Sequence, residues 1–397
     1  MPHGAKIYSF LKLEEDFKLF VIFILVSFGL MALMNIYCYV KYKNMLKAYG
    51  SAFLTRLLFA IFLLMFLLSI SSFVFMKWKN SIFGIIITYT AAAHICFIMY
   101  STLLFLLADA LIFTDNIIHF GKVTHKLFYK IYLRGFFVFA MALLITLCGI
   151  WNASHLKLTE YSVEIAKKNV PEINIVMLSD MHVGSVIGKK ELRELKSLAN
   201  SLSPDILLVC GDIVDHSSSM ELFLASLKTL ADIKTKYGVY FVTGNHEMYL
   251  DNFSAMLPLF AKYGIKVIDD QAVDLGSFIV AGRGDEGRHG SRIALSSILS
   301  ESSGAKPIIL LDHRPRNLEE ARAGGVDLEF AGHTHRGQIF PLNIIASLFN
   351  EALYGHVKKG NYNLIVSSGV GVWNEFPVRV GSFGEIVAVK IKSKYKQ

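Results

Sequence analysis

Four long apolar runs before residue 152 constrain this chain most. They cover about Phe17–Val40, Phe53–Met76, Ile82–Leu107 and Phe136–Trp151, and they account for a mean hydropathy of +0.46 over 397 residues. A helix of about 20 apolar residues spans a bilayer, so three runs are long enough and the fourth is at the lower limit. The first run is too long for a removable signal peptide and lacks a small-residue cleavage site. We therefore expect residues 1–151 to form an all-α transmembrane anchor of about four helices.

The charge distribution separates this region from the remainder of the chain. The formal net charge is +8, and residues 1–151 hold 13 Lys and Arg against 5 Asp and Glu, whereas the remaining residues hold 27 of each kind. A nucleic-acid-binding domain would carry its own basic patch, so we expect no nucleic acid as partner. The excess basic residues flank the apolar runs, where they would meet lipid headgroups.

Four spans place both chain ends on one side of the membrane. Counted together with Lys157, Lys167 and Lys168, the basic residues divide eight against eight between the two sides, so the positive-inside rule leaves the side of the catalytic domain undetermined. We expect an integral, multi-pass protein of the plasma (inner) membrane, with the lipid bilayer as a partner.

Few polar residues interrupt the spans. Asn35, His94 and Asp109 are the notable ones, and a charge within a bilayer is a functional hypothesis by default. His94 and Asp109 are 15 residues apart, roughly 22 Å along a helix, so they cannot pair directly. Asp109 lies near the end of its run, where an interfacial position explains it. The spans are therefore interpreted as an anchor or as an aid to lipid presentation.

After a linker or amphipathic stretch at 152–170, the chain reads as a globular α/β domain at 171–397. Short runs rich in Val, Ile and Leu predict strands that are buried on both faces. Leucines recur at helical spacing from Leu192 to Leu202, and Pro204 ends that helix. The predicted strands are Ile173–Leu178, Ile206–Cys210, Val239–Val242, Phe278–Ala281, Ile308–Leu311, Leu328–Ala331, Leu364–Val366 and Ile386–Ile391.

Polar clusters follow five of these strands. Taken singly, each cluster has a structural explanation as a turn or a core histidine. Five clusters in order at five strand ends do not, because the strand ends of an open α/β sheet meet where ligands bind. The residues concerned are Asp180, His182, Asp212, Asn245, His246, His313, His333 and His335.

Carboxylate, imidazole and amide ligands of this kind suit Mn, Fe or Zn. The four cysteines show no paired spacing, so a closed structural zinc site is not indicated. Seven ligands divide over two ions if one carboxylate bridges them. Two such ions supply a hydroxide nucleophile and neutralise phosphoryl oxygens, and a histidine that is not a ligand then protonates the leaving oxygen. His246 is the candidate for that role.

The motif series resembles the calcineurin-like metallophosphoesterases over about Ile173–Ile391. The features near the C-terminus are similar to one branch, the YaeI-like membrane-associated phosphodiesterases. The matching residues are Asp180-x-His182, Gly211-Asp212-x-x-Asp215, Gly244-Asn245-His246-Glu247, His313 and Gly332-His333-x-His335, with the branch features His333–Gln338, Phe340-Pro341, Val366–Gly371, Pro377–Arg379 and Glu385.

The resemblance implies a four-layer αββα sandwich with two divalent metal ions at the sheet edge. It assigns Asp180, His182 and His335 to the first ion, assigns Asn245, His313 and His333 to the second, and makes Asp212 the bridging ligand. His246 would be the acid or a transition-state hydrogen-bond donor, and Asp215 would brace the loop or orient His246. Every expected ligand is present in the sequence.

These features predict a metal-dependent phosphoric ester hydrolase. The expected substrate is a phosphodiester or pyrophosphate in a lipid or lipid-linked molecule, with Arg336 as a candidate substrate contact. Relatives in the superfamily that cleave UDP-2,3-diacylglucosamine give one specific candidate, which requires a cytoplasmic catalytic domain. The alternatives are a catalytically silent binding or regulatory module of the same fold, and a membrane sensor or transporter with a regulatory phosphoesterase domain.

Overall fold

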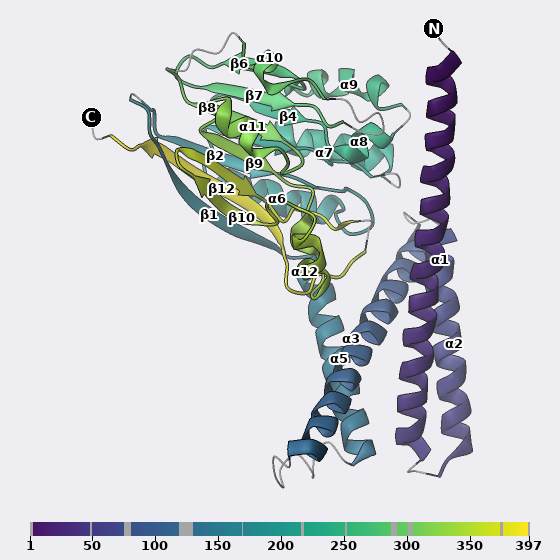
Figure 1. The fold of residues 1–397 in the computed structure, drawn as a ribbon. Coiled ribbons are helices and arrows are strands. Elements are labelled where there is room, and N and C mark those ends of the chain that lie inside the picture. Colours follow the sequence, from purple (N-terminus) through teal and green to yellow (C-terminus); the bar gives the residue numbers. More distant parts are fainter. Residues whose placement is uncertain are drawn as a thin grey trace. The chain divides into compact units, whose positions relative to one another are not determined.

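The computed structural model describes residues 3–47, 50–74, 81–118, 130–168, 170–215, 218–250, 252–286, 292–300, 305–373 and 376–395. The chain forms two compact units. The first comprises residues 1–76 and 86–147, and the second comprises 77–85 and 148–397. Figure 1 shows the elements of both units.

Four helices cover the apolar runs: α1 (His3–Lys47), α2 (Ala52–Val74), α3 (Ile82–Ile118) and α5 (Ile131–Ala153). Each contains an apolar stretch long enough to cross a membrane, which confirms the four predicted apolar helices among the described residues. The helices extend beyond several predicted bounds, because helical hydrogen bonding continues through the flanking polar residues. The predicted end of the second run at Met76 lies outside the described residues. The last six residues of α5 belong to the second unit.

The polar groups of the first unit bind one another across helices. His94 of α3 lies 3.2 Å from Asn35 of α1 and 2.8 Å from Ser69 of α2. Asp109 of α3 forms ion pairs with Lys41 and, at 3.2 Å, with Arg134 of α5. Hydrogen bonds of this kind hold membrane helices together, so these side chains have a structural explanation.

The second unit contains two six-stranded mixed sheets. The first has the order β1-β12-β2-β3-β4-β5, and the second has the order β10-β11-β9-β8-β7-β6. The strands are β1 (Leu156–Ile165), β2 (Ile173–Leu178), β3 (Ile206–Cys210), β4 (Val239–Val242), β5 (Ile265–Val267), β6 (Gln271–Asp274), β7 (Ile279–Arg283), β8 (Ile308–Asp312), β9 (Leu328–Ala331), β10 (Gly355–Lys359), β11 (Tyr362–Val366) and β12 (Gly384–Ser393).

Short helices follow many of the strands. They are α6 (Lys189–Ser201), α7 (Met220–Ala231), α8 (Asn245–Tyr249), α9 (Phe253–Lys262), α10 (Leu295–Ile298), α11 (Leu318–Ala323), the 3-10 turn η2 (His335–Gly337) and α12 (Leu342–Ser347). The leucine pattern that predicted a helix over Leu192–Leu202 corresponds to α6, whose Leu192 and Leu195 are buried.

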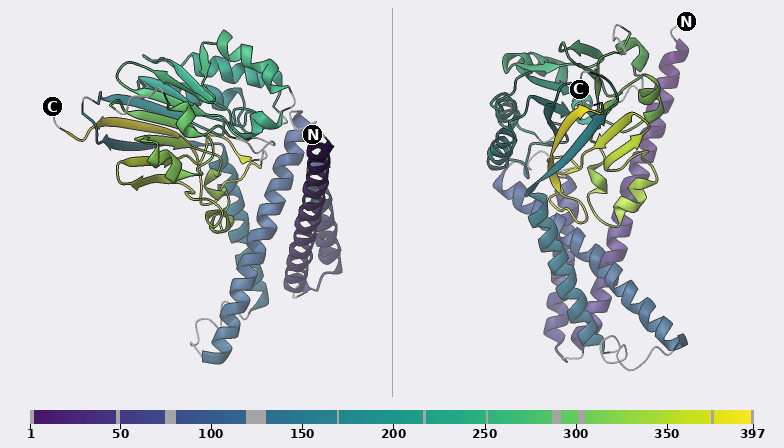
Figure 2. Two further views of the ribbon diagram at one scale, coloured as in Figure 1. Left: turned by 45° about the horizontal axis from the view of Figure 1, so that its top comes forward. Right: turned by 90° about the vertical axis from the view of Figure 1, so that its left-hand side faces the viewer.

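Three apolar cores define the layers of this domain. One core lies between the two sheets and contains inward-facing residues of both, such as Met177 and Phe330. A second core joins the first sheet to α6, α7 and α9, and a third joins the second sheet to α10 and α11. Helices therefore cover the outer faces of two stacked sheets, which confirms the predicted αββα arrangement (Figure 2).

In place of the linker expected over 152–170, Leu156–Ile165 form the edge strand β1. It pairs in parallel with β12 along its whole length, from Leu156 opposite Gly384 to Ile165 opposite Ser393. Polar and apolar residues alternate in β1 because one side of an edge strand faces solvent. Only Ser154 and His155 separate α5 from this strand.

Candidate metal centre

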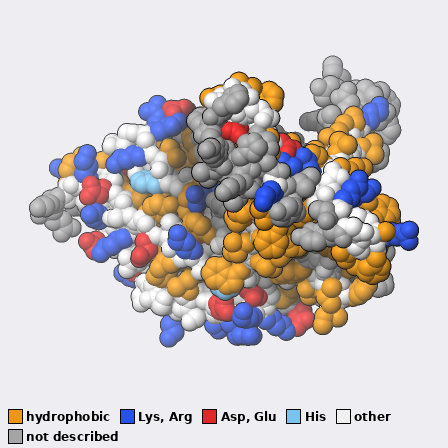
Figure 3. Space-filling view, turned by 90° about the horizontal axis from the view of Figure 1, so that it is seen from below, with side chains coloured by type: hydrophobic (Ala, Val, Ile, Leu, Met, Phe, Trp, Pro, Cys, Tyr) orange, Lys and Arg blue, Asp and Glu red, His pale blue; other side chains and the backbone are white. Residues whose placement is uncertain are grey.

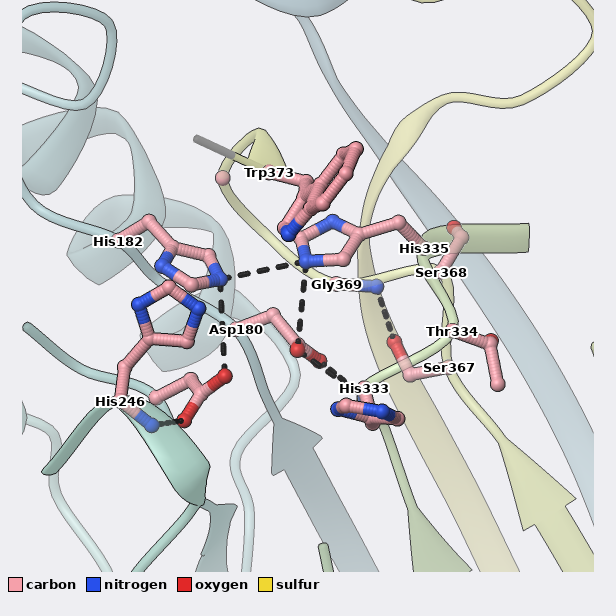
Figure 4. A network of polar contacts seen from close by, with 12 residues as sticks. Asp180, His182, His246, His333, Thr334, His335, Ser367, Ser368, Gly369 and Trp373 are labelled. Atoms are coloured by element: carbon pink, nitrogen blue, oxygen red, sulfur yellow. Dashed lines mark hydrogen bonds and ion pairs between the residues drawn. The ribbon is translucent and has the colours of Figure 1, made fainter. Parts of the chain in front are cut away.

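The metal-ligand candidates lie where five strands end, as expected. Asp180 and His182 follow β2, Asp212 follows β3, and Asn245 begins α8 just after β4. The remaining candidates follow β8 and β9 of the second sheet: His313, His333 and His335. The structure brings all seven together at one edge of the sandwich, and Figure 4 shows Asp180, His182 and His335 turned toward one another.

Asp180, His182 and His335 form the first cluster. The Nε2 atoms of the two histidines are 3.2 Å apart, and His335 Nε2 is 3.4 Å from Asp180 Oδ1. Their ligand atoms all lie within 4.8 Å of one another, so one ion could contact all three. Asp180 also accepts hydrogen bonds from the backbone N–H of His333, which fixes the carboxylate.

Asp212, His313 and His333 form the second cluster. Asp212 Oδ2 lies 3.2 Å from His313 Nε2 and 3.8 Å from His182 Nε2, so it faces both clusters. Its other oxygen accepts a hydrogen bond of 2.9 Å from the backbone N–H of His246. One carboxylate held between two imidazole groups is the arrangement that a bridging ligand requires.

The surroundings of His313 show that this donor set fits a cation. Its Nδ1 donates to the carbonyl oxygen of Cys210 at 2.7 Å, as the second nitrogen of a metal-binding histidine commonly does. Its Nε2 then points at two acceptor oxygens, Asp212 Oδ2 and Asn245 Oδ1, each 3.2 Å away. The nitrogen and the two oxygens converge there, an arrangement that a proton or a metal ion between them stabilises.

The pKa shifts of the histidines are consistent with a cation at this position. Burial opposes charge on His313, but the Asp212 carboxylate prevails and raises its pKa to about 10. A proton on Nε2 thus occupies the position that a divalent ion would take. Burial lowers the pKa of His182, His333 and His335, so these imidazoles are neutral, the form that binds metals.

The backbone is strained around the cluster. Positive φ angles are uncommon for residues other than glycine and mark functional sites when the surrounding structure enforces them. Five of the seven ligand candidates have them: Asp180 (48°), His182 (40°), Asp212 (56°), His333 (67°) and His335 (46°).

Glycines provide the room that the two carboxylates need. A Cβ atom on Gly244 would overlap the side chain of Asp212, and one on Gly332 would overlap that of Asp180. A Cβ atom on Gly369 would lie 2.7 Å from the Asp180 Cβ, and the φ of Gly369 is +79°. Close packing of backbone against the carboxylates therefore leaves their oxygens a narrow range of positions.

His246 lies beside the clusters, with its ring centroid 4.6 Å from that of His182 (Figure 4). Its Nδ1 is 3.1 Å from Asp215 Oδ1, so a carboxylate orients the ring. Burial opposes the charged form, but this hydrogen bond and the charges of Asp212 and Asp215 raise the pKa of His246 to about 9. A protonated histidine at the edge of the cluster is suited to donate a proton from Nε2.

Arg336 has a different environment from the ligand candidates. Its guanidinium lies 4.4 Å from the ring centre of Tyr354 and 5.3 Å from that of Phe383. These aromatic rings hold the cation in this structure. A role as substrate contact stays a prediction.

Glu247 organises the site although the sequence reasoning gave it no role. Its fully buried carboxylate accepts four backbone hydrogen bonds of 2.7–3.2 Å from Gly244 and residues 212–214. Burial and the charge of Asp212 raise the pKa of Glu247 to about 7. The available signal was its position as the third residue of α8, where a glutamate binds the N-terminal backbone.

Arg379 is a second residue whose role the sequence did not reveal. It is 1% exposed, and its guanidinium donates to the carbonyl oxygens of Ser368 (2.8 Å), Phe383 (2.9 Å) and Gly371. The backbone N–H of Gly371 in turn donates to Asp180 O at 2.7 Å. Arg379 thus supports the loop that packs against a ligand candidate.

Several known proteins are similar to this domain. Residues 173–337, which contain all seven ligand candidates and His246, match a family described as calcineurin-like phosphoesterase. An uncharacterized metallophosphoesterase of Aquifex aeolicus is 34% identical over 248 residues, which cover 60% of this chain and 93% of that protein.

Two further relatives are longer than the matched region. A transmembrane protein with metallophosphoesterase domain of Danio rerio is 30% identical over 249 residues, which cover 58% of this chain and 56% of that protein. An uncharacterized metallophosphoesterase of Helicobacter pylori (strain J99) is 31% identical over 228 residues, covering 56% of this chain and 60% of its own. The chain thus spans somewhat over half the length of these relatives.

Proposed function

The chain belongs to the calcineurin-like phosphoesterase family, and on that basis we propose that it is a membrane-anchored, two-metal phosphoesterase that hydrolyses a phosphodiester or pyrophosphate bond. The observation that carries the proposal is the convergence of His313 Nε2 with the oxygens of Asp212 and Asn245. We further propose a lipid or lipid-linked substrate, which the four membrane-length helices support. A UDP-2,3-diacylglucosamine-type pyrophosphate is one specific candidate, and a plasma-membrane location belongs to the same proposal.

In this proposal Asp180, His182 and His335 would hold one ion, Asn245, His313 and His333 would hold the other, and Asp212 would serve both. Two bound divalent ions supply Lewis acidity toward water and the phosphoryl oxygens. Burial and the surrounding hydrogen bonds fix the positions of these carboxylates and imidazoles before the substrate binds. This preorganisation avoids reorganisation during the reaction.

His246 acts on the leaving group. When the oxygen of water bonds to phosphorus, the water releases a proton to solvent, the P–O bond to the leaving group breaks, and the leaving oxygen gains negative charge. His246 donates its Nε2 proton to this oxygen, and Asp215 stabilises the charged ring before the transfer. The resulting products are a phosphomonoester and an alcohol, or two phosphates from a pyrophosphate.

A test of the proposal uses the full-length protein in lipid nanodiscs and bis(p-nitrophenyl) phosphate as substrate. After treatment with a chelator we expect hydrolysis to fall to background, and we expect Mn²⁺, Fe²⁺ or Zn²⁺ to restore it, with two ions bound per chain by elemental analysis. Hydrolysis should return because the folded chain supplies all the metal ligands. Hydrolysis that survives complete metal removal would refute the proposal, and two bound ions without hydrolysis of any phosphoester would favour a silent module.

Gly369 gives a second test that leaves every ligand in place. We expect Gly369→Ala to raise the metal concentration needed for half-maximal hydrolysis at least about tenfold, because the new methyl group displaces Asp180. Gly325→Ala is the matched control, since its φ is +78° and no atom lies within 4 Å of the new Cβ. Both substitutions place a Cβ atom on a residue with a positive φ angle, which costs about 1–2 kcal/mol in each variant. Equal metal requirements in the two variants would show that this contact does not position Asp180.

A further inference from the structure

An exposed apolar patch surrounds α12, immediately after the candidate ligands of the second sheet. Helix α12 has no buried residue, and no charged residue occurs between Ile339 and Asn350. Leu348 and Phe349 are 77% and 81% exposed. The apolar patch consists of Phe340, Leu342, Ile344, Ile345, Leu348, Phe349 and Trp373.

The exposure of so many adjoining apolar side chains indicates a contact surface. Single exposed apolar side chains are ordinary on protein surfaces, but adjoining ones mark a site that contacts a membrane, a ligand or another protein. Figure 1 shows α12 at the lower end of the domain, and Figure 3 gives a space-filling view from below, in which hydrophobic side chains cover much of the surface.

Hydrogen bonds tie the patch to the end of the last membrane span. Phe340 N donates to Val380 O at 2.8 Å, and Val380 N donates to Gln338 O at 3.1 Å. The adjacent residue, Arg379, donates its N–H to Gly149 O at 2.9 Å and accepts from Asn152 Nδ2 at 3.1 Å. Gly149 and Asn152 lie on α5, within the span Leu133–Ala153 and within the same compact unit as the patch.

This connection identifies the bilayer as the occupant. The segment before α12 pairs with a segment that contacts the last turns of a membrane span, so the patch lies where that span leaves the hydrocarbon. Trp151 at this end of α5 is 62% exposed, as is typical of residues at a membrane interface. Uncharged Phe, Leu, Ile and Trp side chains are those that enter the headgroup–acyl boundary.

The patch is also close to the candidate metal centre. Phe340 is the fifth residue after His335, so their Cα atoms are at most about 18 Å apart. Trp373 donates its backbone N–H to the Gln338 side chain at 2.7 Å, and Figure 4 shows its side chain beside His335. The phosphate group of a membrane lipid that lies against the patch could therefore reach the site.

We propose that the apolar patch enters the surface of the bilayer and that the substrate of the site is a membrane lipid whose phosphate reaches the metals while its acyl chains stay in the membrane. The substrate part of this inference rests on the proposed function. The membrane contact does not, since it depends only on the patch and its position beside α5.

The contact is tested on the full chain in nanodiscs without reference to turnover. In a Cys148→Ser background, which removes the one exposed cysteine among the described residues, Leu348→Cys carries a fluorophore. We expect nitroxide-labelled phospholipids to quench this fluorophore strongly. A label at Met220→Cys is the control, because Met220 is 53% exposed but begins α7, outside the patch, and should stay bright. Equal, weak quenching at both positions would overturn the membrane contact, as would a disulfide-linked dimer of the unlabelled Leu348→Cys protein after oxidation in air.

The substrate part is tested by the double variant Leu348→Glu/Phe349→Glu. We expect it to hydrolyse soluble bis(p-nitrophenyl) phosphate at the normal rate but to cleave a long-chain phospholipid or diacyl-pyrophosphate in the bilayer at least about tenfold more slowly. Equal rates on the bilayer substrates would overturn the lipid inference. An inactive wild-type protein with a quenched Leu348 label would instead sink the proposed function and leave the membrane contact standing.

Discussion

Replacing Asp212 by Ala is expected to abolish metal-dependent hydrolysis, with a loss of more than about a thousandfold in kcat/KM. Asp212 Oδ2 faces His182 of the first cluster and His313 of the second, so one substitution removes a ligand from both proposed ions. Each remaining set would then bind its ion more weakly. The measurement is the rate on bis(p-nitrophenyl) phosphate together with the number of ions bound per chain, which should fall below two.

Asp232→Ala is the matched control for this substitution. Asp232 is an aspartate at the protein surface whose partners are Lys196 and Lys228. Exposed ion pairs contribute little to stability, so this variant should fold, bind two ions and turn over normally. Undiminished turnover of Asp212→Ala would end the two-metal hypothesis, whatever the control shows.

The second large effect is expected from His246→Ala, which should keep both ions bound but lose about 10²–10⁴ of the rate. The loss should depend on the leaving group. A p-nitrophenolate ion leaves without a proton, whereas an alkoxide needs one, so alkyl diesters should lose far more rate than aryl diesters. Loss of metal from this variant would show that His246 is a ligand and not the acid.

The Asp215→Asn variant reports on the same proton by a different route. The hydrogen bond and charge of Asp215 raise the pKa of His246 against the opposing effect of burial. An acid works only while protonated, so activity falls as pH rises through this pKa. Removal of the Asp215 charge lowers the pKa, and the alkaline limb of the pH–rate profile should move to lower pH. If the alkaline limb does not move, Asp215 does not set the pKa of the catalytic acid.

Much of this site could be predicted from sequence because its residues follow strands that are themselves easy to recognise. The runs Ile206–Cys210 and Leu328–Ala331 are buried on both faces, and they correspond to β3 and β9 with the predicted bounds. Once strands are placed, the residues after them must lie at one edge of a sheet.

Other features depend on tertiary contacts that no local pattern encodes. Strand β1 was expected to be a linker, because its alternating polar residues resemble an amphipathic stretch and its partner β12 lies over 200 residues away. The bonds of Glu247 to residues 212–214 and of Arg379 to Ser368 and Gly371 likewise join distant segments. Asp109 was placed at the membrane interface, and its ion pairs with Lys41 and Arg134 follow only from the packing of three helices.

The position of β12 between β1 and β2 has a consequence for how the protein is made. The first sheet cannot close until the segment Gly384–Ser393 has been synthesised, because that segment separates its two earliest strands. During translation the apolar helices emerge first, and β1 and β2 then emerge before β12, the strand that pairs with both of them. Pairings between such distant segments form slowly and leave edges exposed meanwhile. The first sheet of the sandwich therefore closes only after β12 has been made, later than the apolar helices that precede it in the chain.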